Sequence, residues 1–174
     1  MQKGLIIVNT GNGKGKTTAA LGLALRAWGQ GLRVLILQFI KGSWKYGELN
    51  AISKLDDNIL IMPLGEGFTN RNIDDKEKHK IVANETLQKA KKEIDSKKWD
   101  MVILDEVNYA LKYELIELNE VLAILDNKDA DLHLVLTGRD VKDEIMARAD
   151  MVTEMKEIKH HYKNGIKAQR GIEF

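Results

Sequence analysis

The 174-residue sequence is long enough for one domain with its own hydrophobic core, and we expect a single domain over residues 1–174. Its 44% hydrophobic and 30% charged residues are ordinary for a globular protein, and a net charge of +1 argues against a surface dedicated to nucleic acid. The absence of cysteine excludes disulfides and thiolate metal sites. No run is apolar enough to span a membrane and no signal-peptide pattern opens the chain, so we expect a cytoplasmic protein.

The first predicted elements are a strand, a glycine-rich loop and a helix. The apolar run 5–8 precedes the loop, and residues 16–28 follow as an apolar helix ended by Gly29 and Gly31. This order is the context that a phosphate-binding loop requires, because free N–H groups at the helix start can hold an anion. Lys16 adds a positive charge, and the Thr17 hydroxyl suits Mg²⁺. We predict a nucleoside triphosphate site made of Gly11, Asn12, Gly13, Lys14, Gly15, Lys16, Thr17 and Thr18.

The loop departs from the usual GxxxxGK[ST] pattern at its first position. That pattern places a glycine at position 10, where this chain has Thr10, and Gly11 follows instead. The glycine-bounded loop is therefore one residue shorter than usual. The alternative, a glycine-rich turn without a ligand, is disfavoured because strand, loop, Lys16-Thr17 and helix all agree.

Further apolar runs alternate with helical segments along the rest of the chain. Strands are predicted at 34–37, 59–62, 101–104 and 132–136, and the alternating run 151–155 reads as an edge strand. Amphipathic helices are predicted at 73–95, with Asn72 as N-cap, and around 118–125. This order predicts an α/β fold like that of P-loop NTPases: a doubly wound, mostly parallel sheet with helices on both faces.

Two acids end the predicted strand 101–104. Asp105 and Glu106 would lie at the carboxyl edge of the sheet, where ligands bind in such folds. We expect this strand directly beside the loop-bearing strand, so that Thr17, Asp105 and Glu106 serve Mg²⁺. Asp105 would either ligate the ion or support the site from behind. In an ATP hydrolase, Glu106 would instead polarise a water molecule.

A set of peptides in fixed order carries a resemblance to a known family. They are TGNGKGKTTAA (10–20), QFIKG (38–42), GEGFT (65–69), LDEVNYAL (104–111), TGR (137–139), ADMVTEM (149–155), KHHY (159–162) and GIKAQRGIE (165–173). Together they resemble the ATP:corrinoid adenosyltransferases of the CobA (BtuR/CobO) type over essentially the whole chain. The loop alone would be shared by many families, whereas the ordered set is far more specific.

The resemblance implies an activity, in adenosylcobalamin biosynthesis or salvage. The 5′-deoxyadenosyl group of ATP would pass to the Co(I) centre of a reduced corrinoid, cobalamin or a precursor such as cobyrinic acid diamide, and triphosphate would leave. Co(I) is itself a strong nucleophile, so no Ser, Cys or His nucleophile is needed. Lys16 and Glu106 are then the catalytic residues, acting on the leaving triphosphate. In this family the nucleotide is bound in reversed orientation, and we hypothesise that the short loop at Thr10 contributes to that.

The resemblance also suggests contacts to the corrinoid. Phe68, with Thr69 and Asn70, falls where the family places an aromatic residue at the corrinoid face, although a core aromatic is the alternative for Phe68. Asn70 stands where a known member has tryptophan, which leaves displacement of the lower axial ligand open. Lys41 could contact a ligand or lie in a solvated loop. Arg139 could contact phosphate or corrinoid, or pair with Asp140 or Asp143.

The resemblance implies Mg²⁺ as cofactor, ATP and a reduced corrinoid as co-substrates, a homodimer, and a reduced flavoprotein as transient electron donor. Some members carry an N-terminal extension over the nucleotide site; this sequence begins at the first strand, so we expect a site that is either more open or ordered only when the corrinoid binds. Two other functions stay open on the residues alone. One is a P-loop ATPase or kinase in which Glu106 activates water or an acceptor hydroxyl, and the other is a non-catalytic nucleotide-binding module.

Overall fold

A six-stranded sheet forms the centre of the protein, whose computed structural model describes residues 3–42, 46–67 and 73–173. Neighbouring strands follow the order β3-β2-β4-β5-β1-β6, and every pairing is parallel. A mostly parallel sheet was predicted, and the observed one is parallel throughout. The strands are β1 (Ile6–Thr10), β2 (Val34–Gln38), β3 (Ile59–Pro63), β4 (Met101–Asp105), β5 (His133–Thr137) and β6 (Met151–Glu154).

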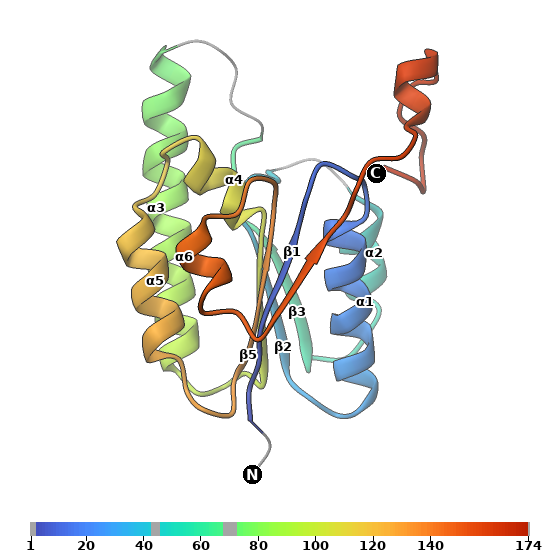
Figure 1. Ribbon diagram of the computed structural model, residues 1–174. Helices are drawn as coiled ribbons and strands as arrows, with labels where there is room; N and C mark the ends of the chain where they lie inside the picture. Colours follow the sequence, from blue (N-terminus) through green and yellow to red (C-terminus); the bar gives the residue numbers. More distant parts are fainter. Residues whose placement is uncertain (1–2, 43–45, 68–72, 174) are drawn as a thin grey trace.

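Helices cover both faces of the sheet, which confirms the predicted doubly wound α/β architecture (Figure 1). The inner strands are apolar at consecutive positions because both of their faces are buried: Leu35 and Leu37 pack in one core cluster, Val34 and Ile36 in the other. One face carries α1 (Lys16–Gly29) and α2 (Gly47–Ile52). The other carries α3 (Ile73–Asp95), α4 (Val107–Lys112), α5 (Leu118–Asn127) and α6 (Asp143–Met146).

The predicted helices are present, and three short ones were not predicted. The helix α1 ends at Gly29, and Gly31 adopts φ +81°, as a glycine after a helix end commonly does. The elements α2, α4 and α6 have six, six and four residues, too few for a helical period to show in the sequence. Asn72, the predicted N-cap of α3, lies outside the described residues.

The strand order corrects one expectation about the site. The strand bearing Asp105 was expected beside β1, but β5 pairs with both β1 and β4 and so separates them. Sequence pattern does not encode strand order, because every inner strand has the same apolar character. The carboxyl ends of β1, β5 and β4 nevertheless meet at one edge, which carries Thr10, Thr137 and Asp105.

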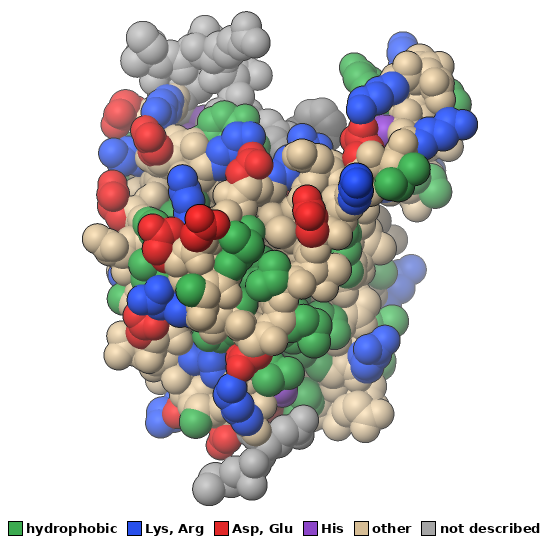
Figure 2. All heavy atoms as spheres, in the orientation of Figure 1, with side chains coloured by type: hydrophobic (Ala, Val, Ile, Leu, Met, Phe, Trp, Pro, Cys, Tyr) green, Lys and Arg blue, Asp and Glu red, His purple; other side chains and the backbone are tan. Residues whose placement is uncertain are grey.

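The strand β6 lies at the sheet edge, as predicted, but it does not bury one side. All four of its residues are exposed, and hydrophobic side chains gather in the middle of this face of the protein (Figure 2). Met151 and Val152 contribute to that apolar surface. No helix of the described residues is long and apolar enough to cross a membrane.

Candidate functional site

The glycine loop between β1 and α1 is held from outside by the residue that follows β6. The N–H of Gly13 donates to the carbonyl oxygen of Met155 at 2.6 Å, and the N–H of Met155 donates to that of Thr10 at 2.8 Å. A Cβ on Gly13 would lie 2.7 Å from the Met155 oxygen, so this close approach requires glycine. Gly15 caps α1 at φ +119°, in the left-handed region. Met155 is a supporting residue that sequence reasoning assigned no role, since only the fold brings it to the loop.

Lys16 is folded back onto the loop. Its Nζ donates to the carbonyl oxygens of Gly11 and Gly13, both at 2.8 Å, and the residue is only 7% exposed. Burial lowers the pKa of Lys16, although nearby Glu106 acts in the opposite direction. The two carbonyls satisfy two of the three donors of this largely buried ammonium group.

Asp105, at the end of β4, links the start of α1 to the neighbouring strands β2 and β5. Its Oδ1 accepts hydrogen bonds from the hydroxyls of Thr17 and Thr137, each at 2.8 Å, and its Oδ2 accepts one from Nε2 of Gln38 at 3.1 Å. The residue is 1% exposed. A buried carboxylate with three donors is well satisfied, and it fixes the position of the Thr17 hydroxyl. The intervening strand β5 thus supplies Thr137 as a bridge.

The backbone of Glu106 adopts a conformation that is uncommon for residues other than glycine. Its φ of +61° is left-handed, and its N–H donates to the Thr137 hydroxyl at 2.8 Å. Such a conformation costs about 1 kcal/mol outside glycine and is common at functional sites. Burial, and then the charge of Asp105, raise the pKa of Glu106, while Lys16, Lys41 and Arg139 lower it. The turn directs an acid of raised proton affinity to the loop.

A cavity of about 510 Å³ opens beside the loop. Its lining includes side chains of both charges, and Lys41 is paired to Glu48 and lies 4.5 Å from the centre of the Tyr46 ring. Hydroxyl and carboxylate oxygens of Thr17 and Glu106 are the donors that Mg²⁺ prefers, with phosphates completing its shell. The described residues that line it are Lys14, Gly15, Lys16, Thr17, Thr18, Leu21, Lys41, Gly47, Glu48, Glu106, Gly171, Ile172 and Glu173.

Of the remaining residues predicted from the sequence, one is described by the structure and three are not. Arg139 is exposed and forms no hydrogen bond or ion pair within the described chain, although its charge lowers the pKa of both Lys16 and Glu106. Asp140 pairs with Lys112 instead, at 2.6 Å. Phe68, Thr69 and Asn70 lie outside the described residues. The chain reaches them from Gly67, whose N–H donates to the Ile40 oxygen at 2.7 Å, next to Lys41 in the cavity wall.

Sequence reasoning missed the contribution of the C-terminus to this cavity. Gly171, Ile172 and Glu173 line it although they lie more than 150 positions after the loop. The GIKAQRGIE peptide was part of the family resemblance, but nothing in its residue types pointed to a nucleotide.

The parallel sheet with its glycine loop, buried lysine and strand-end acids defines a P-loop-type nucleotide-binding protein. The family model for ATP:corrinoid adenosyltransferases BtuR/CobO/CobP matches residues 2–174, and the chain belongs to this family of enzymes. A corrinoid adenosyltransferase from Sinorhizobium is 45% identical over 99% of this chain and 81% of its own length. The Escherichia coli K12 corrinoid adenosyltransferase is 39% identical over 99% and 87%.

Among solved structures, a KaiC-like protein from Pyrococcus horikoshii aligns with a TM-score of 0.49 at 16% identity, over 90% of this chain and 74% of that one.

Proposed function

We propose that this enzyme transfers the 5′-deoxyadenosyl group of ATP to the Co(I) centre of a reduced corrinoid and releases triphosphate. The observation that carries the proposal is the meeting of Lys16, Thr17 and Glu106 in one cavity of a chain that belongs to this family. These side chains suit a leaving polyphosphate and its metal ion. The cobalt lone pair forms the Co–C5′ bond, and the C5′–O bond breaks with its electron pair going to triphosphate.

Each of the proposed site residues has a distinct part in this reaction. Lys16 would exchange the two loop carbonyls for phosphate oxygens, and the N–H groups of residues 11–18 that face the cavity would hold the rest. Thr17 and Glu106 would hold Mg²⁺, which supplies charge stabilisation for the leaving group. Asp105 would act by orienting Thr17, because its oxygens already accept three hydrogen bonds.

The corrinoid would approach from the side of Lys41 and Gly67. Phe68, Thr69 and Asn70 follow Gly67 in the chain and are proposed as its contacts, with Lys41 and Arg139 as further ligand contacts. A reduced flavoprotein as electron donor, a homodimer and a cytoplasmic location belong to the same proposal.

The short loop at Thr10 is proposed to favour the reversed orientation of the nucleotide. Inserting a glycine after Thr10 should lower transfer relative to ATP hydrolysis, because it changes which phosphate each N–H meets. Unchanged transfer with no gain in hydrolysis would contradict this.

The direct test mixes the protein with Mg-ATP and chemically reduced corrinoid under anaerobic conditions. The proposal predicts the cobalt absorbance of a light-sensitive alkylcorrinoid, together with triphosphate. Formation of ADP and phosphate without a change at cobalt would overturn it in favour of an ATPase or kinase. No turnover at all would favour a nucleotide-binding module.

A further inference from the structure

The chain after β6 leaves the body of the protein and then returns to the nucleotide cavity. Figure 1 shows this C-terminal segment rising from the end of β6, forming the short 3₁₀ helix η1 (His161–Asn164) and turning back, with the chain end above α1 and α2. Gly165 and Gly171 provide the turns, at φ +77° and +79°. Only its last described residues, 171–173, line the cavity.

Glu173 ties the returning segment to the glycine loop. Its Oε2 accepts a hydrogen bond from the N–H of Gln169 at 2.7 Å, and its Oε1 lies 3.9 Å from Nζ of Lys14 and 3.1 Å from Nε2 of His161. The Gln169 N–H, followed by the charges of Lys14 and His161, lowers the pKa of Glu173 despite some burial. The contacts to Gln169 and His161 lie within the returning segment, and the long ion pair with Lys14 is the contact of this carboxylate with the glycine loop.

Ile172 adds an apolar side chain to the lining of this cavity. Its side chain is 59% exposed, and Leu21 of α1 is the other large apolar side chain among the described lining residues. A triphosphate gains nothing from such surface, whereas the face of a purine base loses unfavourable contact with water by packing on it. Leu21 and Ile172 are thus the lining side chains that suit a nucleoside.

We propose that residues 171–173 form the nucleoside wall of the nucleotide site. Ile172 packs against the base, and Glu173 is a positioning residue that sets the wall through Lys14 and His161. This deepens the proposed function and rests on one part of it, the binding of a nucleotide. It assigns substrate recognition to a segment far from the loop in sequence.

Inorganic tripolyphosphate is the probe that separates the two ends of the site, because it has the phosphates of ATP and no nucleoside. In Ile172→Ala, the Kd for Mg-ATP measured by calorimetry should rise about tenfold, as loss of an aliphatic side chain that the bound base would cover implies, while the Kd for Mg-tripolyphosphate stays within about twofold. Ile158→Ala is the matched control: this isoleucine is 84% exposed on the same segment and does not line the cavity, so both constants should be unchanged.

Glu173→Gln tests the positioning role. Removal of a negative charge should tighten tripolyphosphate binding, while loss of the tie to Lys14 loosens the nucleoside wall, so the ratio of the ATP to the tripolyphosphate constant should rise. An unchanged ratio would show that Glu173 only repels phosphate and would overturn its role. Equal weakening of both ligands, or no weakening, in Ile172→Ala would overturn the wall itself. These results concern binding, so they are independent of whether adenosyl transfer occurs.

Discussion

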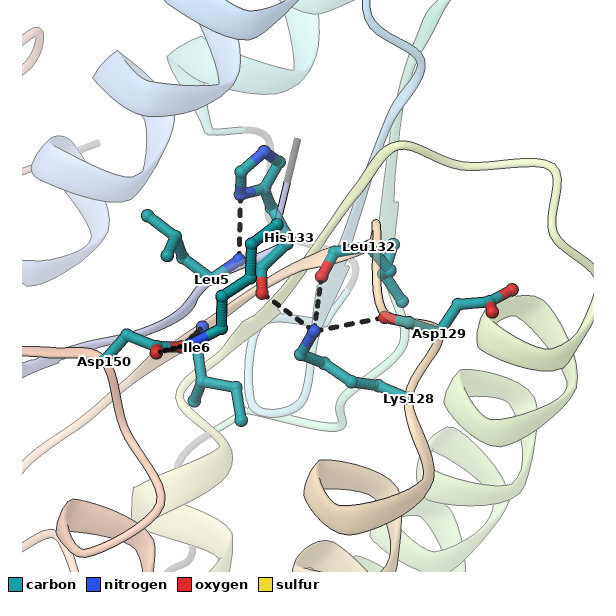
Figure 3. A network of polar contacts seen from close by, with 9 residues as sticks. Leu5, Ile6, Lys128, Asp129, Leu132, His133 and Asp150 are labelled. Atoms are coloured by element: carbon teal, nitrogen blue, oxygen red, sulfur yellow. Dashed lines mark hydrogen bonds and ion pairs between the residues drawn. The ribbon is translucent and has the colours of Figure 1, made fainter. Parts of the chain in front are cut away.

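The two ends of the sheet satisfy their polar groups in different ways. At the amino-terminal end, Nζ of Lys128 donates to the carbonyl oxygens of Gly4, Asp129 and Leu132 at 3.0, 3.1 and 2.9 Å (Figure 3). The Leu5 N–H donates to Nδ1 of His133 and the Ile6 N–H to Asp150, at 3.1 and 2.9 Å. At this end, side chains therefore satisfy backbone N–H and carbonyl groups.

The carboxyl-terminal end leaves polar atoms unused. Within the described chain, buried atoms without a hydrogen-bond partner include Nδ2 of Asn9, Oε1 of Gln38 and both amide atoms of Asn108. Each such atom costs about 1–3 kcal/mol. Glu106 adds a left-handed backbone and a half-buried carboxyl of raised pKa at the same edge. The amino-terminal end of the sheet therefore stabilises the fold. The carboxyl-terminal end keeps unpaired polar atoms, a left-handed backbone and a carboxyl of raised pKa beside the cavity, at a cost in stability.

The largest effect is expected at the carboxyl-terminal end of the sheet, from Lys16→Ala. Loss of the cation that we propose meets the leaving phosphates should lower kcat/KM for adenosyl transfer about 10³-fold, since a single charge-stabilising donor is worth that much. Stability should change little, because burial of the charged head already offsets its two hydrogen bonds. Transfer assays and chemical denaturation measure the two quantities. Turnover of the variant at the wild-type rate would show that Lys16 does not touch the leaving group.

Glu106→Gln should separate function from stability. Transfer should fall about a hundredfold because a ligand proposed for Mg²⁺ loses its charge. Since burial and Asp105 raise the pKa of Glu106, its ionised form destabilises the folded state above that pKa. The variant should therefore have the higher free energy of unfolding at pH 8, with the difference closing as pH falls toward the ordinary carboxyl value of 4.5. Denaturation at several pH values measures this, and a variant less stable at pH 8 would contradict it.

At the amino-terminal end of the sheet, Lys128→Met should lower stability and leave activity unchanged. The methionine keeps the aliphatic stem but removes the donor to the carbonyls of Gly4 and Leu132, while that of Asp129 still accepts from the Leu132 N–H, so the free energy of unfolding should fall by about 2 kcal/mol. Transfer per folded molecule should not change. Lys3→Met is the control: Lys3 is highly exposed and pairs with Asp150, so the loss should stay below about 1 kcal/mol. Loss of turnover in folded Lys128→Met would break the division between the two ends.

The smallest effect is expected from Glu48→Gln in the cavity wall. Glu48 pairs with Lys41, and its removal leaves that lysine free to meet a polyphosphate. The KM for Mg-ATP should fall about threefold at unchanged kcat, the size expected for a partly screened ion pair. A higher KM in steady-state kinetics would mean that Glu48 is needed to hold Lys41 in place.

Local signals predicted much of the fold and the centre of the site. The glycine loop, Lys16 and the acids at the end of β4 are each readable from neighbouring residues, as are the five buried or half-buried strands and the exposed edge strand β6. Long-range features were not readable: β5 lies between β1 and β4, Met155 binds the loop, and residues 171–173 line the cavity. These depend on which segments meet after folding, and no periodicity or composition encodes that.

The chemistry at C5′ offers the most direct test of the account. The enzyme would be supplied with Mg-ATP carrying ¹³C at C5′ and with a chemically reduced corrinoid, and the products followed by ¹³C and ³¹P NMR. The account predicts the label in a cobalt-bound methylene group and one inorganic triphosphate for each label transferred. Label that stays in ADP, with phosphate released, would contradict it.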